Sequence, residues 1–263
     1  MKFNKYQMFF YSLFFLVIQD FVAQSDYDNA YNELRSKVYN SNVSKEQKVI
    51  SSYNNAYALI KKDNSVKCYI EKSKCDYLMG LFYMDLENNS KAIDYFQSSM
   101  DLAYKANKKK ETAQGFLAYA ESLAQICTLK PTSYLIANGL KVGTIAKKAL
   151  KLDKGLGAAR YLVCSIIAYA PIPFRNFSKA EKIYLEILEK DNLDEEDYFN
   201  IYKSLGFINY QKKQFEDADK WFALAEKIYP NNKFLKSLQT REYTKSDFIT
   251  VNVDPIIDCL MED

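Results

Sequence analysis

The sequence contains no histidine, and this absence is the most restrictive feature of its composition. Histidine is the usual general base near neutral pH, a frequent zinc ligand and a member of every Ser-His or Cys-His catalytic pair. Most familiar hydrolase mechanisms are therefore excluded. Carboxylates, lysines and tyrosines remain available for acid-base chemistry, but they form no recognisable catalytic motif. The sequence predicts a protein that is not an enzyme and binds no cofactor.

Glycine and proline are also scarce, with 7 glycines and 5 prolines in 263 residues. A sheet protein with many tight turns uses more of both, whereas helices joined by short polar turns need few. The hydrophobic fraction of 48% is large enough for a substantial core. The composition therefore indicates an all-α protein.

Charge of neither sign dominates the chain, whose formal net charge is +3. Removing the first 24 residues takes away Lys2, Lys5 and Asp20 and leaves +2. Such a balance gives no general attraction for nucleic acid. The basic run Lys108 to Lys110 is interpreted as a solvated turn between helices. We expect no nucleic-acid partner.

The 5 cysteines show no spacing typical of a metal site. Cys68 and Cys75 lie seven positions apart, which is about 10.5 Å of helical rise and too far for a disulfide within one straight helix. The simplest interpretation of all of them is small apolar core residues. An odd number leaves at least one thiol unpaired, and whether any others pair stays open.

The N-terminus has the pattern of a secretory signal peptide. Lys2 and Lys5 precede an apolar stretch from Met8 to Ile18, and Ala23 offers a small-residue cleavage site. The stretch is shorter than the roughly 20 residues that a transmembrane helix needs. We predict a signal peptide over residues 1–24 and an exported protein of a bacterial periplasm or envelope. The alternative is an uncleaved segment, and only in that case do we expect membrane association.

Two amphipathic helices are predicted over residues 194–211 and 215–228. The turn between them is short and polar, so the two helices must pack antiparallel as a hairpin. The characteristic positions are Tyr202, Leu205 and Gly206 in the first helix, then Ala218, Phe222 and Ala225 in the second, then Pro230, which ends it.

This pattern resembles the tetratricopeptide repeat (TPR), a helix-turn-helix of about 34 residues with small residues where its helices touch. The same arrangement recurs earlier as Met79 and Gly80 followed by Ala92, Phe96 and Ser99. Between these two units there is room for two degenerate ones, over residues 111–152 and from residue 156 onward, with breaks at Pro131 and at Pro171 to Pro173. The resemblance implies a right-handed superhelical solenoid of antiparallel helix hairpins.

The solenoid is predicted to occupy residues 25–243. Residues 26–39 and 44–62 are expected to form a divergent N-terminal hairpin that caps the stack, and residues 231–242 a C-terminal capping helix with a polar outer side. Residues 244–263 are predicted to be an extended or disordered tail.

In TPR proteins the first helix of each pair lines the concave face, so the resemblance implies a binding surface there. The projected residues are Asn200, Lys203, Phe207 and Tyr210, together with Tyr77 from the earlier unit. Aromatic and basic side chains in such a groove suit a peptide segment or an acidic ligand. The alternative is that these residues pack between neighbouring helices.

A loop over residues 169–177 is the second candidate site. It contains Tyr169, Phe174 and Arg175 and is stiffened by two prolines, so its aromatics either pack on the next repeat or face a partner. The break at Pro171 is similar to that of exported bacterial TPR proteins associated with tripartite periplasmic solute transporters. That likeness implies envelope or transporter components as possible partners.

An acidic run over residues 191–197 lacks the alternating ligands and turn glycine of a calcium loop. It precedes a predicted helix, whose N-terminus favours negative charge, so we interpret it as helix capping and predict no metal site.

The sequence as a whole therefore predicts a scaffold that binds a protein or peptide partner on its concave face. The alternative function is a periplasmic small-molecule binding or transporter-accessory protein with a pocket beneath the loop at residues 171–177.

Overall fold

The computed structural model describes residues 24–60, 64–169 and 175–239, and every regular element within them is a helix. The predicted signal peptide up to residue 23, residues 170–174 of the candidate loop and the predicted tail lie outside the described residues. The helices are the helix over residues 24–39, α2 (Glu46–Leu59), α3 (Val66–Asp85), α4 (Asn89–Lys109), α5 (Ala113–Leu129), α6 (Thr132–Leu152), α7 (Gly157–Tyr169), α8 (Phe177–Lys190), α9 (Glu195–Gln211), α10 (Phe215–Ile228) and α11 (Lys233–Gln239).

Short polar side chains fix where many of these helices begin. Ser65, Asn88, Thr112, Asn176 and Asp194 each accept a hydrogen bond from a backbone N–H three residues further along the chain. Each such cap satisfies a donor that the first helical turn leaves free and stabilises the helix by about 1 kcal/mol. The capping residues explain why the chain divides into many moderate helices and not a few long ones.

Consecutive helices pack as antiparallel hairpins, and the predicted repeat pattern is confirmed in two of them. In α9–α10 the ring of Phe222 lies against Gly206, where any Cβ would overlap it. In α3–α4 the ring of Phe96 lies against Gly80 in the same way. The connecting turns also match, because Glu87 and Lys213 occupy equivalent positions with φ of 60° and 62°.

The two middle hairpins reach the same packing with different residues. In α5–α6 the small residues Val142, Ala146 and Ala149 are buried along α6. In α7–α8 the bulky Tyr184 is fully buried between Ala180 and Ile187. The predicted helix break at Pro131 is confirmed, since that residue directly precedes α6. The fold is therefore the predicted all-α solenoid of TPR-like helix hairpins.

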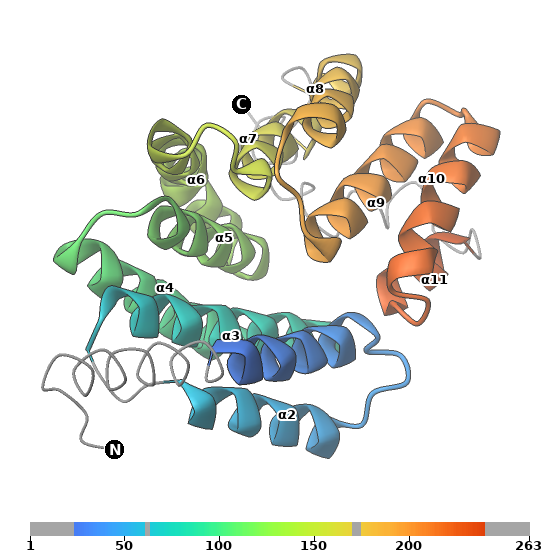
Figure 1. Ribbon diagram of the computed structural model, residues 1–263. Coiled ribbons are helices and arrows are strands. Elements are labelled where there is room, and N and C mark those ends of the chain that lie inside the picture. The colour runs from blue at the N-terminus through green and yellow to red at the C-terminus, as the bar shows by residue number, and fades with distance from the viewer. Residues whose placement is uncertain (1–23, 61–63, 170–174, 240–263) are drawn as a thin grey trace, which may run out of the picture.

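The two ends of the stack meet, which the sequence did not predict. The ring of Tyr39 stacks on Tyr229, with centroids 4.6 Å apart. The backbone N–H of Asn42 donates to the carbonyl of Asn231 at 3.2 Å, and the Asn232 amide donates to the carbonyl of Tyr39 at 2.9 Å. Figure 1 shows α11 near the end of the blue N-terminal helix that leads into the loop before α2. We call this contact the closure; it joins residues 35–42 to residues 194–199 and 229–233.

The last described helix, α11, contacts the rest of the stack through its buried side. Leu235 of α11 is only 1% exposed, and the Lys233 ammonium donates to the carbonyl of Asp85 at the end of α3 at 2.8 Å. The first hairpin, formed by the helix over residues 24–39 and α2, therefore contacts two parts of the molecule. One is the second hairpin, α3–α4, and the other is the C-terminal end of the described chain. A solenoid whose ends touch has a fixed curvature, because neither end can move without breaking these contacts.

The cysteines of the described residues are core residues, as predicted. Cys68, Cys75, Cys127 and Cys164 are free thiols and are at most 4% exposed. Burial raises the pKa of the Cys75 and Cys164 thiols to about 12, so both are unreactive at neutral pH. No helix among the described residues combines the length and apolarity needed to cross a bilayer.

Candidate interaction surface

Charged side chains from four helices face one another on the inner side of the stack. Arg35 comes from the first helix, Lys74 from α3, Glu121 from α5, and Glu196 and Asp197 from the first turn of α9. They are close enough that Glu196 and Asp197 raise the pKa of Glu121 while Lys74 opposes that rise. We call this surface the inner face.

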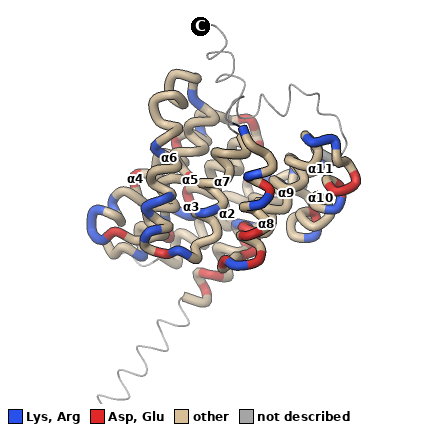
Figure 2. Tube along the Cα trace, turned by 90° about the horizontal axis from the view of Figure 1, so that it is seen from above, with Lys and Arg blue, Asp and Glu red and all other residues tan. Residues whose placement is uncertain are grey.

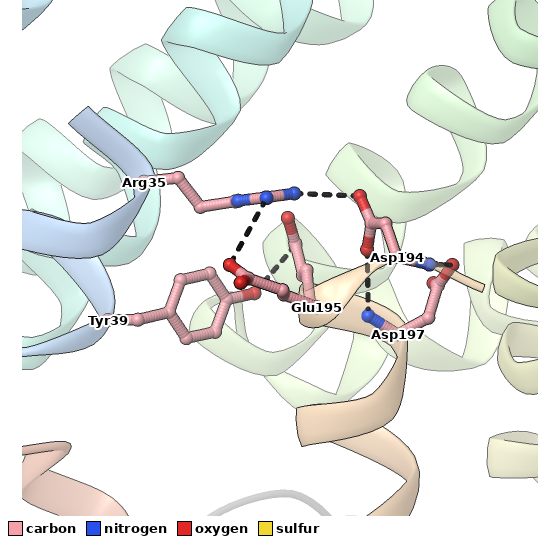
Figure 3. A network of polar contacts seen from close by, with 6 residues as sticks. Arg35, Tyr39, Asp194, Glu195 and Asp197 are labelled. Atoms are coloured by element: carbon pink, nitrogen blue, oxygen red, sulfur yellow. Dashed lines mark hydrogen bonds and ion pairs between the residues drawn. The ribbon is translucent and has the colours of Figure 1, made fainter. Parts of the chain in front are cut away.

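Arg35 joins the inner face to the closure. Its guanidinium lies 2.7 Å from the Asp194 carboxylate and 3.7 Å from that of Glu195 (Figure 3). The arginine side chain is 9% exposed, whereas the two carboxylates are 57% and 74% exposed. One turn along the same helix, the Tyr39 hydroxyl donates to Glu196 Oε1 at 2.6 Å. Two neighbouring turns of the first helix thus bind the N-terminus of α9.

The acidic run before α9 is a capping box, which confirms the capping interpretation. The Asp194 carboxylate accepts from the N–H of Asp197 at 3.0 Å, and the Asp197 carboxylate accepts from the N–H of Asp194 at 3.2 Å. Asp191 at the start of the run binds Arg160 at 3.1 Å. Among the described residues no group of potential ligands has a geometry that holds a metal ion.

Burial and mutual repulsion act together on the inner carboxylates. Desolvation, followed by the charge of Asp194, raises the pKa of Asp197 to about 7. Desolvation also raises the pKa of Glu196, although the Tyr39 hydroxyl and Arg35 oppose the rise. The pKa of Glu121 is raised well above its usual value, first by desolvation and then by Glu196 and Asp197. Burial first, and the neighbouring carboxylates second, therefore disfavour the charged forms of the acidic groups on the inner face.

Two predicted site residues, Asn200 and Lys203, lie together further along α9. The Lys203 ammonium donates to Asn200 Oδ1 at 3.2 Å and lies 5.2 Å from the Phe199 ring centroid and 5.6 Å from that of Phe234. Burial lowers the pKa of Lys203 to about 8, against the opposing charges of Asp85 and Glu196. A cation held between two rings and facing α3 belongs partly to the closure.

Tyr77, which was predicted to line the concave face, is half-buried on α3. Its hydroxyl accepts a hydrogen bond from Gln125 Nε2 on α5 at 3.3 Å. Its pKa is raised well above the usual value by burial and by Glu121 and Glu196, so the hydroxyl belongs to the same electrostatic environment.

The remaining predicted residues gather elsewhere. Phe207 is 7% exposed, and its ring lies 5.3 Å from that of Tyr169 and 6.1 Å from that of Phe177. The Arg175 guanidinium lies 5.3 Å from the centroid of the Phe177 ring, so Tyr169, Arg175 and Phe207 share one junction between α7, α8 and α9. Tyr210 packs edge-on against Phe215 at the α9–α10 turn, 5.4 Å away. Phe174 lies outside the described residues.

Sequence reasoning missed Arg35, Glu121 and Glu196 as members of the surface. Glu196 was assigned only to capping, and Arg35 belongs to a hairpin that was expected to lie at one end of the stack. The signal for Glu121 was present, because it shares a helical face with Gln125, four positions on. The sequence could not show that the first helix reaches α9.

Comparisons with known proteins found similar chains only among solved structures. No family model and no curated protein matches the chain. Among solved structures, a thermophilic TPR protein of Thermus thermophilus has 14% identity and a TM-score of 0.45, covering 74% of this chain and 93% of that one. YrrB, described as a TPR protein with an unusual peptide-binding site, has 16% identity and a TM-score of 0.34, covering 75% of this chain and 84% of that one.

Proposed function

We propose that the protein is an interaction scaffold that binds a polypeptide segment on its inner face. The observation that carries the proposal is the excess of carboxylates contributed there by separate helices, Glu121 from α5 and Glu196 and Asp197 from α9. Burial, and after it the repulsion between these groups, makes their charged forms costly in the unbound protein. A lysine or arginine of a partner relieves that cost through charge-assisted hydrogen bonds.

This proposal reverses the charge of the partner: the residues predicted from the sequence suit an acidic ligand, whereas the inner face suits a basic segment. The predicted residues Lys203 and Asn200 suit an acidic ligand, but Lys203 already faces Asp85 and lies between two rings. The carboxylates nearer the start of α9 outnumber the lysine and arginine side chains of the protein that lie beside them. The partner segment therefore carries basic side chains, and Tyr77 supplies an aromatic surface beside them.

Selection from a phage-displayed random peptide library tests this function. The parent protein is expected to select peptides rich in Lys and Arg, and a Glu121→Gln, Asp197→Asn variant to lose them. The matched control is Glu186→Gln, Glu189→Gln on α8, which removes the same charge away from the inner face. Peptides without basic enrichment, or equal binding by both variants, would contradict the proposal.

The competing small-molecule function places its ligand at the junction of Tyr169, Phe177 and Phe207, beside the loop. A Phe177→Ala, Phe207→Ala variant separates the two. Loss of peptide binding in this variant, with binding retained by Glu121→Gln, Asp197→Asn, would favour the junction over the inner face.

We also propose that the chain is exported, because Lys2, Lys5 and the apolar stretch from Met8 to Ile18 precede a small-residue cleavage site. Fusion of residues 1–30 to a reporter that is active only after export tests this. N-terminal sequencing of the mature protein is expected to begin near Gln24 or Ser25. A reporter that stays inactive would contradict export.

A further inference from the structure

The fold brings together two lysine groups that are far apart in the sequence. One lies at the C-terminal end of α4 and the other at the C-terminal end of α6, on either side of the start of α5. The side chain of Asn107 on α4 contacts Gly115 on α5, and the Lys148 ammonium on α6 lies 5.5 Å from the ring centroid of Phe116. We call the following exposed lysines the basic edge: Lys105, Lys108, Lys109, Lys110, Lys147, Lys148, Lys151 and Lys154.

The basic edge differs in charge from the rest of the molecule. Residues 101–111 and 147–154 contain eight lysines and three acidic residues, a net charge of +5 in a chain whose total is +3. Figure 2 shows Lys and Arg recurring along the side of the molecule where α4 and α6 are labelled. A local field of this kind attracts an anionic surface.

The lysines of the basic edge are not used to hold the fold together. Among the described residues, none of the eight lies within 4.0 Å of a carboxylate. Elsewhere lysines are paired: Lys91 with Glu46 at 3.5 Å and Lys212 with Glu181 at 2.7 Å. The unpaired ammonium groups at the edge are therefore available to a partner.

Large apolar side chains are exposed among these lysines. Tyr104 is 51% exposed, with the Lys108 ammonium 5.3 Å from its ring centroid. Leu152, at the end of α6, is 53% exposed. Lysine ammonium groups with aromatic and aliphatic side chains between them suit the headgroup region of a bilayer, where charged tips stay in water and apolar groups enter the interface.

The chain also enters the described structure at this end of the stack. Gln24, the first described residue, contacts Lys67 in the first turn of α3. Because α3 and α4 are antiparallel, the start of α3 lies at the same end as the last turn of α4. The preceding sequence contains the apolar stretch from Met8 to Ile18.

From the charge, the exposed apolar groups and the point of chain entry, we propose that the basic edge docks on the surface of an anionic lipid bilayer. The lysines lie at the level of the phosphate groups, and Tyr104 and Leu152 enter the interface.

Vesicle co-sedimentation of the full-length protein tests the proposal, with phosphatidylcholine vesicles compared to phosphatidylcholine mixed with phosphatidylglycerol. Lys2 and Lys5 of the N-terminal segment are basic as well, so the contribution of the basic edge is measured by comparing the edge variant with a matched control, both of which keep that segment. A Lys108→Gln, Lys109→Gln, Lys148→Gln, Lys151→Gln variant is expected to lose on the order of 600-fold in affinity for the anionic vesicles, at about fivefold for each of the four lysines near the surface. Added salt is expected to weaken parent binding.

The matched control removes four exposed lysines outside the edge, Lys45, Lys48, Lys130 and Lys182, and changes the net charge equally. It is expected to bind anionic vesicles within about threefold of the parent, since only distant charges change. Equal parent binding to both lipid mixtures, or an equal loss in both variants, would overturn the proposal. Tighter binding to an acidic peptide or a single-stranded oligonucleotide than to the anionic vesicles would also overturn it and assign the edge to that partner.

Discussion

Arg35 and Lys148 are both cations beside an aromatic ring, and they differ in almost every other respect. The Arg35 guanidinium lies 5.9 Å from the Tyr31 ring centroid, is nearly buried and binds carboxylates of α9. The Lys148 ammonium lies 5.5 Å from the Phe116 ring centroid, and the residue is exposed without a carboxylate beside it among the described residues. The Arg35 guanidinium in the closure holds the chain ends together, whereas the lysines of the basic edge are available to bind a partner.

This difference separates the charged groups that stabilise a repeat protein from those that bind its partners. Buried, paired charges report on internal geometry, and replacing them changes stability. Exposed, unpaired charges of one sign contribute little to stability and much to association. The comparison can be tested by measuring the free energy of unfolding and hydrogen exchange for variants in each region.

The largest effect is expected for Tyr39→Ala at the closure. The substitution removes a ring that stacks on Tyr229 and meets Phe199 edge-on, with centroids 4.6 and 5.4 Å away. Deleting a buried aromatic ring lowers the free energy of unfolding by about 3 kcal/mol. Denaturant unfolding measures this loss, and Tyr104→Ala, at an exposed tyrosine, is the control with an expected loss below about 1 kcal/mol. Equal losses in the two variants would remove the distinction between closure and edge.

Arg35→Met is expected to have the next largest effect. It keeps much of the side-chain volume but leaves Asp194 and Glu195 without their cation, so we expect a loss of about 2 kcal/mol, less than for a fully buried pair because both carboxylates are half-exposed or more. Hydrogen exchange is expected to accelerate at residues 229–235 before it does so in α3–α4. Unchanged protection there would show that Arg35 does not hold the ends together. Arg35→Lys keeps the positive charge and tests whether the planar guanidinium group is needed.

The carboxyl groups of the inner face are expected to make the free energy of unfolding fall as the pH rises. This effect is smaller than those of Tyr39→Ala and Arg35→Met. Burial raises the pKa of Asp197 to about 7 in the folded protein, so the folded state binds more protons than the unfolded state between about pH 4 and pH 7. The free energy of unfolding therefore falls as the pH rises through this window. Allowing for solvent screening, we expect a decrease of roughly 1 kcal/mol between about pH 5 and pH 8.

Asp197→Asn isolates this contribution, because an amide oxygen can still accept the N–H of Asp194 in the capping box. Its free energy of unfolding is expected to fall less than that of the parent over the same pH range. Glu121 and Glu196 have raised pKa values as well, so some dependence of the same sign should remain. Stability that rises with pH in the parent would show that the inner carboxylates are relieved of repulsion in the folded state.

Most of the fold could be predicted from the sequence, because helix pairing in this solenoid is a local property. The contact of Gly206 with Phe222 lies within one hairpin, and spacing alone indicated it. The closure joins Asn42 to Asn231, and no periodicity reports a contact between such distant residues. The same limit applies to the site: Tyr77 could be projected onto the inner face from its own helix, whereas Arg35 depends on the curvature of the whole stack.

The basic edge illustrates that limit most directly. Lys108 to Lys110 were interpreted as a solvated turn between helices; all three are exposed, but Lys108 and Lys109 belong to the last turn of α4, and the interpretation missed their neighbours on α6. The Lys108→Gln, Lys109→Gln, Lys148→Gln, Lys151→Gln variant is expected to change the free energy of unfolding by less than about 0.5 kcal/mol, the smallest effect here, because exposed lysines without a carboxylate partner contribute little to stability. The measurement is denaturant unfolding beside the vesicle assay on the same preparation. A loss above about 1 kcal/mol would mean that these lysines support the fold, and reduced vesicle binding would then report unfolding.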